Sequence, residues 1–182
     1  MATDIVMPKR DPHNFSVYWR VKHLDGVELL RAHFEAHLFP PHFHDDFVIA
    51  GTSSGGGRFA TGGTSYLARA GHLILFNPGE PHYGNTVDGY PWDYRAIYIT
   101  PARLKAYLVG TLGNESSDLP YFRMARYSDE VLSMRFIRCH TLLEENGDRM
   151  EQESHLLDLL SSIFVTCAHS RPKSPFENWF NG

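Results

Sequence analysis

Short apolar runs and turn residues alternate through the first hundred residues of the chain. Between residues 15 and 100, runs rich in Val, Ile, Tyr, Phe and Leu are interrupted by Gly, Asp and Pro at intervals of roughly eight to twelve residues, which is typical of β-sandwiches and barrels. Residues 24–26 (Leu-Asp-Gly) form one predicted turn, and the glycine-rich residues 53–57 are predicted to form another, a wide hairpin turn. We therefore predict a β-barrel of about seven or eight strands over residues 15–100.

The apolar pattern changes from strand to helix spacing after Thr100. Thr100 is a suitable N-cap and is followed by Pro101, a residue favoured at the first helical position. Ser128 is predicted to cap a second helix, and Asp148 begins a capping-box pattern that opens a third. Residues 101–170 are therefore predicted to form a helical region after the barrel.

The last predicted helix carries more apolar residues than one buried face requires. A helix that packs only against its own barrel needs an apolar stripe about 100° wide. The surplus predicts a homodimer in which this helix meets the same helix of a second copy. The alternative is that both long helices pack only onto the barrel as core. The predicted dimer contacts are Leu156, Leu160, Ile163 and Cys167.

The two ends of the chain lack a regular pattern. Residues 1–14 are polar and contain two prolines, and we predict an N-terminal arm there. Residues 171–182 are predicted to be a linker or tail. Neither a signal-peptide pattern nor an apolar stretch of bilayer length is found, so we expect a cytoplasmic protein without a membrane partner.

Charge and cysteine content narrow the function classes. Lys and Arg total 17 against 21 Asp and Glu, which gives a net charge of −4. No global positive field therefore attracts a nucleic-acid backbone, and we do not expect this chain to bind DNA by itself. Cys139 and Cys167 lack C-x-x-C spacing and are predicted to be reduced, buried thiols.

Three histidines and one carboxylate are the strongest candidates for chemistry. On a strand, His42, His44 and Asp46 would point to one face, because alternate side chains of a strand share a face. His82 follows a predicted tight turn at the end of a later strand. Three imidazoles with a nearby carboxylate would suit zinc, nickel, manganese or iron, whereas without a metal the same groups would line a polar pocket.

The histidine segments resemble the two motifs of the cupin family. The first is the H-x-H of residues 42–44, and the second is the G-x5-N-P-G-x2-H of residues 71–82. The resemblance implies a mostly β fold with C-terminal helices: a cupin-like double-stranded β-helix (jelly-roll) barrel followed by a helical hairpin. The glutamate of the family motif falls where this chain has Val48 and Ile49, so only Asp46 could replace it as a ligand.

A wider set of segments resembles the sensor domain of AraC-type transcription regulators. The likeness runs from about Tyr18 to Ala168. It implies a ligand-sensing barrel that binds a small-molecule effector, a helical dimerisation region and no enzymatic activity or required cofactor. It also implies that DNA is contacted only by a C-terminal helix-turn-helix domain, which we expect to be absent from this chain. The segments that carry the likeness are residues 26–32, 42–47, 76–82, 92–95 and 119–122.

The AraC resemblance adds candidate effector contacts to the histidines. Tyr83 and Tyr94 occupy positions where that family places effector-contacting side chains, and Trp92 shares the face of Tyr94 by alternation. Tyrosine combines an apolar ring with one polar group, which suits a small-molecule pocket. The competing interpretation of the chain is a small metal-dependent cupin enzyme, such as an isomerase or dioxygenase, with open coordination positions for substrate.

Overall fold

The computed structural model describes residues 11, 13–112, 119–145 and 147–170. Most of the predicted arm and all of the predicted tail lie outside these residues. Asn14, placed at the end of the predicted arm, is the first residue of a strand. The elements, in chain order, are β1 (Asn14–Arg20), β2 (Val27–Phe34), β3 (Leu38–His42), β4 (Phe47–Thr61), β5 (Thr64–Arg69), β6 (His72–Phe76), β7 (His82–Thr86), β8 (Trp92–Ile99), α1 (Pro101–Leu112), β9 (Pro120–Phe122), β10 (Arg126–Ser128), α2 (Glu130–Glu144), α3 (Arg149–Cys167) and β11 (Ala168–Ser170).

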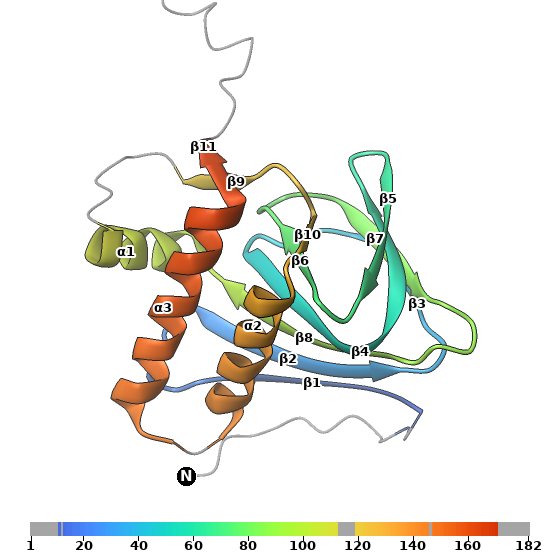
Figure 1. Cartoon of the computed structure of the whole chain (residues 1–182), viewed down its shortest axis with the longest axis horizontal. Helices are drawn as coiled ribbons and strands as arrows, with labels where there is room; N and C mark the ends of the chain where they lie inside the picture. The colour runs from blue at the N-terminus through green and yellow to red at the C-terminus, as the bar shows by residue number, and fades with distance from the viewer. Residues whose placement is uncertain (1–10, 12, 113–118, 146, 171–182) are drawn as a thin grey trace, which may run out of the picture.

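Two antiparallel layers share the long strand β4 and form the barrel (Figure 1). The first half of β4 pairs with β6 and β8, and its second half pairs with β5 and β7. The larger layer follows the order β1-β2-β8-β4-β6-β10, whereas β3 pairs with β7. The predicted β-rich region therefore contains eight strands within residues 14–99.

The glycine-rich residues 53–57 belong to β4, so the predicted hairpin turn is wrong. The pairing of β4 with β8 shifts register between Thr52 and Ser54, where the strand passes from one layer to the other. Gly55 has a φ of +66°, and a Cβ there would lie 1.5 Å from the Pro91 carbonyl oxygen. Glycines are needed here because the bent strand lies directly against a neighbouring segment, not because the chain reverses.

The central strands bury both of their faces, and each face belongs to a different core. Residues such as Ile49 and Ile97 face the helices and join a core that includes Phe136 of α2. Their neighbours Ala50 and Ala96 face the barrel interior. Burial on both faces explains the continuous apolar runs of β4 and β6, which do not show the alternation of a half-exposed strand.

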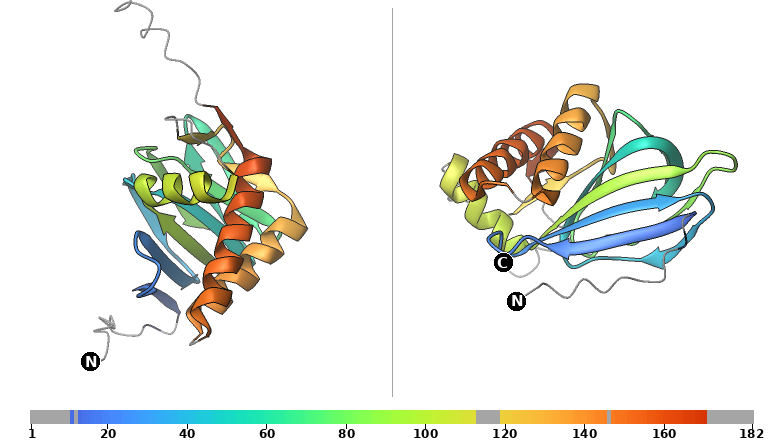
Figure 2. Two further views of the ribbon diagram at one scale, coloured as in Figure 1. Left: turned by 90° about the vertical axis from the view of Figure 1, so that its left-hand side faces the viewer. Right: turned by 90° about the horizontal axis from the view of Figure 1, so that it is seen from below.

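The helices lie together on one side of the barrel (Figure 2). Thr100 caps α1 as predicted, since its Oγ1 accepts a hydrogen bond of 3.2 Å from the Arg103 N–H. Asp148 likewise caps α3 by accepting from the Glu151 N–H at 3.0 Å. The cap of α2 is Asp129 and not the predicted Ser128, because the Asp129 carboxylate accepts from the Leu132 N–H at 2.9 Å. Ser128 instead ends β10, which pairs with β6.

The four residues predicted as dimer contacts are buried within their own chain. Leu156, Leu160, Ile163 and Cys167 are at most 6% exposed and belong to the core between the helices and the barrel. They therefore present no surface to a second copy, and the choice of these residues as the interface is corrected. The apolar face of α3 is wide because this helix packs against three elements, α1, α2 and β11.

Two further sequence expectations can be compared with the structure. Cys139 and Cys167 are both free and buried, as predicted. Among the helices in the described part of the chain, none is long and apolar enough to cross a membrane.

Candidate functional site

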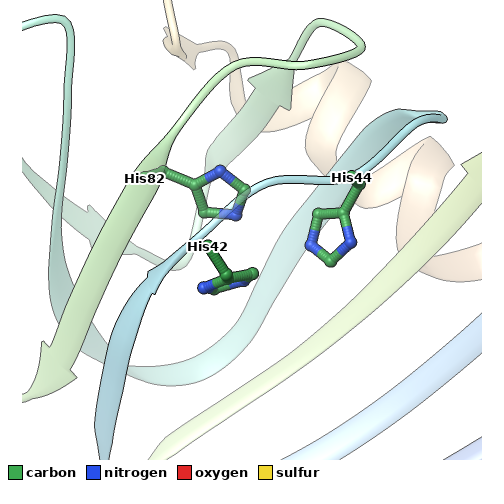
Figure 3. Close-up of side chains that lie close together, drawn as sticks. All are labelled: His42, His44 and His82. Atoms are coloured by element: carbon green, nitrogen blue, oxygen red, sulfur yellow. The ribbon is translucent and has the colours of Figure 1, made fainter.

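Three histidines from two separate segments meet at the barrel interior (Figure 3). His42 is the last residue of β3, His44 follows it in the connection to β4, and His82 is the first residue of β7. One nitrogen from each imidazole lies within 4.8 Å of the others. The ring centroids of His42 and His82 are 4.3 Å apart, because these two residues pair directly across β3 and β7.

Backbone carbonyl groups orient two of the imidazoles. His42 Nδ1 lies 2.7 Å from the Pro40 carbonyl oxygen, and His82 Nδ1 lies 2.9 Å from the Glu80 carbonyl oxygen. A carbonyl only accepts, so in each ring Nδ1 donates and Nε2 keeps its lone pair free. Metal-binding histidines are commonly oriented in this way by the hydrogen bond of the other ring nitrogen.

A tight turn before His82 is tied to the segment that carries His44. The Gly79 N–H donates to the His44 carbonyl oxygen at 2.8 Å, and Gly79 has a φ of +74° that favours glycine. The Glu80 carboxylate accepts hydrogen bonds from Asn77 and from the Thr61 hydroxyl. Glu80 therefore stabilises the turn and is not directed to the imidazoles.

Burial favours the neutral form of two of the imidazoles, His44 and His82. Burial, followed by the neighbouring His82 and His42, lowers the pKa of His44 to about 4. Burial also lowers the pKa of His82, whose ring stacks on Phe76 at 3.8 Å. Neutral imidazoles have the lone pairs that metal coordination requires.

The three imidazoles suit a divalent transition metal better than a hard cation. Their donor atoms are nitrogens, which zinc, nickel and iron accept readily. Three protein ligands leave at least one coordination position for another molecule. His42, His44 and His82 would therefore hold the ion, which would supply a Lewis-acidic centre when bound.

A small pocket, called here the histidine pocket, opens beside the three imidazoles. Its cavity volume is about 80 Å³. The lining residues come from β3, β4, β6, β7 and β8 and from the segment after β3. They are Phe39, His42, His44, Val48, Ala50, Phe59, Ile74, Phe76, His82, Tyr83, Gly84, Trp92, Tyr94, Ala96 and Tyr98.

The predicted aromatic contacts all line this pocket, but to different degrees. Trp92 is 4% exposed, and its indole N–H donates to the Thr52 hydroxyl at 3.1 Å. Tyr94 lies beside it, with ring centroids 5.0 Å apart. Tyr83 is 53% exposed, because it alternates with the inward residues His82 and Gly84 along β7 and so contacts only the edge of the pocket.

Asp46 does not join the histidines. The strand β3 ends at His42, and residues 43–46 are not part of a strand, so the assumed alternation breaks down before Asp46. Asp46 instead lines a separate groove with Arg20 and Glu28. Burial and the nearby carboxylates of Glu28 and Asp45 raise its pKa. The prediction of Asp46 as a fourth ligand is therefore wrong for this structure.

Several lining residues were not among the sequence candidates. Phe39, Phe59, Phe76 and Tyr98 supply most of the remaining aromatic surface. Tyr98 lies four residues after Tyr94 on β8, so it shares the face of Tyr94 by period-two alternation. The phenylalanines look like ordinary core residues in the sequence, and only the closed barrel shows that they border a cavity.

Arg95 lies on the face of β8 opposite Tyr94, because neighbouring residues of a strand point to opposite faces. Its side chain is only 14% exposed. Its guanidinium forms an ion pair with Glu144 at 2.6 Å and donates to His140 Nδ1 at 3.0 Å. Arg95 therefore joins β8 to α2.

Two of the solved structures similar to this chain are described as cupins. A cupin protein from Bacteroides fragilis is 19% identical, covers 54% of this chain and 86% of its own, and has a TM-score of 0.43. A cupin 2 conserved barrel domain protein from Leptotrichia buccalis is 14% identical, covers 52% of this chain and 45% of its own, and also has a TM-score of 0.43.

Comparison at the sequence level is more informative. The chain is 31% identical over 125 residues to YbfI of Bacillus subtilis (strain 168), described as an uncharacterized HTH-type transcriptional regulator. The match covers 69% of this chain and 45% of that regulator, so the chain spans less than half of its relative. The family model for the AraC-like ligand binding domain matches residues 26–160. The chain therefore belongs to the family of AraC-like ligand-binding domains.

Proposed function

We propose that this domain binds a small-molecule effector in the histidine pocket and thereby controls a DNA-binding domain outside this sequence. The observation that carries the proposal is the convergence of three imidazoles and three tyrosines on a cavity inside the barrel. A concave, largely apolar lining with a few convergent polar groups is the usual form of a ligand site. Contact with DNA would then belong to a helix-turn-helix domain in a longer chain.

A thermal stabilisation screen tests effector binding. A ligand present at one hundred times its Kd stabilises the folded state by about 2.7 kcal/mol, which corresponds to roughly 5–10 °C in Tm for a domain of this size. The matched control is Ala96→Val, which narrows the cavity. A compound that raises the Tm of the wild type but not of the control supports the site. Equal shifts in both proteins would place binding elsewhere.

We also propose that His42, His44 and His82 hold a divalent metal ion. The support is the spacing of their nitrogens and the carbonyl groups that orient His42 and His82. Protein purified without a His tag and incubated with zinc should retain about one ion per chain, and His82→Ala should lose most of it. The exposed His155 offers a matched control, since His155→Ala should keep the metal.

The three-histidine cluster also favours a second candidate function, a metal-dependent enzyme. Three protein ligands leave room for a substrate at the ion. The long helices favour a sensor over an enzyme. They pack on one side of the barrel and supply none of the residues that line the histidine pocket. A metal content well below one ion per chain after zinc incubation would contradict the enzyme.

The helices support a homodimer through a surface different from the one predicted. Val131 on α2 and Val165 on α3 are 64% and 70% exposed, and both line a groove of about 410 Å³ between the two helices. Met134 is also 49% exposed. We propose that a second copy covers this groove, because Val131 and Val165 expose apolar side chains in it beside polar groups such as Arg135.

Sedimentation measurements test the dimer. Val131→Asp combined with Val165→Asp should give monomers, because two carboxylates would be desolvated in the interface. Val109→Asp on α1 is the matched control, since Val109 is 40% exposed and lies outside the groove. An unchanged sedimentation coefficient for the double variant would contradict this interface.

A further inference from the structure

The lining of the histidine pocket carries no permanent charge. Of its fifteen lining residues, none is Lys, Arg, Asp or Glu. A phosphate group carries about two negative charges and three acceptor oxygens, which one metal ion and two tyrosine hydroxyls would not satisfy, and a sugar requires a hydrogen-bonding partner for each hydroxyl. Most of this lining is hydrocarbon or aromatic ring, so it suits neither ligand.

The polar groups that the pocket does offer are few and grouped. Besides the three imidazoles, the hydroxyls of Tyr94 and Tyr98 have no hydrogen-bond partner among the described residues. The Tyr98 ring lies 5.1 Å from the His44 ring, so one of these donors stands beside the imidazole cluster. Trp92 adds no donor, because its indole N–H already bonds to Thr52.

The cavity limits the size of the ligand. Its volume of about 80 Å³ is roughly half of the 150 Å³ apolar cavity that accommodates benzene. The enclosed part of a ligand therefore has on the order of three or four non-hydrogen atoms. Val48, Ala50, Ile74 and Phe76 supply an apolar wall from β4 and β6 for that part.

We propose that the effector of this site is a short-chain monocarboxylate that binds only when a divalent metal ion occupies the imidazole cluster. A carboxylate has one charge to compensate, and the described lining holds no cationic side chain with which to pair it. Metal coordination supplies the missing positive charge. The hydrocarbon chain then lies against the apolar wall, and a tyrosine hydroxyl donates to the second carboxylate oxygen. This inference rests on the effector-binding function and the metal site proposed above.

Titration calorimetry on zinc-loaded and EDTA-stripped protein tests the proposal. The probes are acetate, propionate, butyrate and hexanoate, with propionamide as an uncharged control of the same size as propionate. Each added methylene should tighten binding about fourfold until the cavity is filled, after which the affinity should level off. Stripped protein and His82→Ala should bind none of the acids, whereas His155→Ala should match the wild type.

The outcomes distinguish a failure of the carboxylate inference from a failure of the effector-binding function or the metal site on which it rests. Equal affinity for propionate and propionamide, or equal binding by stripped protein, would overturn the metal-dependent carboxylate site. Zinc-loaded protein that binds no acid would also overturn it. If another small molecule then raises the Tm of the wild type but not of Ala96→Val, the effector-binding function stands without this ligand class. Failure of the wild type to retain zinc would overturn the metal site on which the inference depends.

Discussion

The same three strands β4, β6 and β8 build two different interiors. On the side of the helices, Ile49, Leu75 and Ile97 are at most 1% exposed and pack into a continuous aliphatic and aromatic core. On the other side, the alternate residues surround a cavity, and two of them, Ala50 and Ala96, are small. Neighbouring residues of one strand therefore serve different purposes: one fills space and the next leaves it open.

The helix-facing core and the barrel interior should therefore contribute differently to folding stability and to ligand binding. A close-packed core stabilises the fold through burial and dispersion, and the removal of a methyl group there is costly. A pocket must instead tolerate unfilled volume and polar groups without partners until a ligand arrives. The helix-facing core should therefore dominate the free energy of unfolding, whereas substitutions in the barrel interior should mainly change binding.

The largest expected effect comes from two neighbouring residues on β8. Ile97→Ala should destabilise the protein by about 2–4 kcal/mol, because it opens a cavity in the close-packed core. Ala96→Val should change stability by less than about 1 kcal/mol, because its added methyl groups enter existing free volume. Urea denaturation measures both. Similar losses for the two variants would contradict the contrast between the two faces.

The free energy of unfolding should depend on pH because of a buried histidine at the contact between α2 and β8. His140 is fully buried, its Nε2 lies 3.2 Å from the Ala96 carbonyl oxygen, and Arg95 and Glu144 are its charged neighbours. Burial and then the positive charge of Arg95 lower the pKa of His140 to about 4.

Acid should therefore destabilise the wild type through His140. Below pH 6.5 the unfolded state binds a proton that folded His140 resists, so stability falls as the pH decreases. Between pH 6.5 and pH 5 this contribution should cost about 2 kcal/mol. Denaturant unfolding of His140→Gln should show a correspondingly smaller loss. If the free energy of unfolding has the same pH dependence in the wild type and in His140→Gln, His140 does not cause the loss of stability in acid.

The smallest effect concerns the start of the helix that covers the aliphatic core. Asp129→Ala should cost about 1 kcal/mol, because the Leu132 N–H loses its acceptor at the N-terminus of α2. Ser128→Ala serves as the neighbouring control and should change stability by less than about 0.5 kcal/mol. Thermal denaturation can measure both, and the reverse ranking would make Ser128 the cap.

The fold class could be predicted from the sequence because its signals are local. The turn at residues 24–26, the cap at Thr100 and the cap at Asp148 each depend on a few neighbouring residues, and the structure contains all three. Residues 53–57 could not be assigned in the same way. Glycines favour a turn, but here they allow β4 to pass close to Pro91 and Trp92, and these contacts come from a distant strand.

The candidate site was partly predictable for the same reason. His42, His44 and His82 stand in recognisable motifs, and the structure brings their rings together. Asp46 was misplaced because alternation applies only while the strand continues, and β3 ends at His42. The dimer contacts were misassigned because a helical stripe shows how much surface is apolar but not which neighbour covers it. On α3 that neighbour is the chain's own core.

The passage of β4 through both layers also predicts how the molecule opens. Since this strand pairs with β5, β6, β7 and β8, neither layer can separate from the other without breaking its hydrogen bonds. The paired amide groups at the centre of β4 should therefore exchange with deuterium only through global unfolding. The pocket is thus built around the segment whose local opening should be rarest, and ligand entry must depend on the surrounding segments instead.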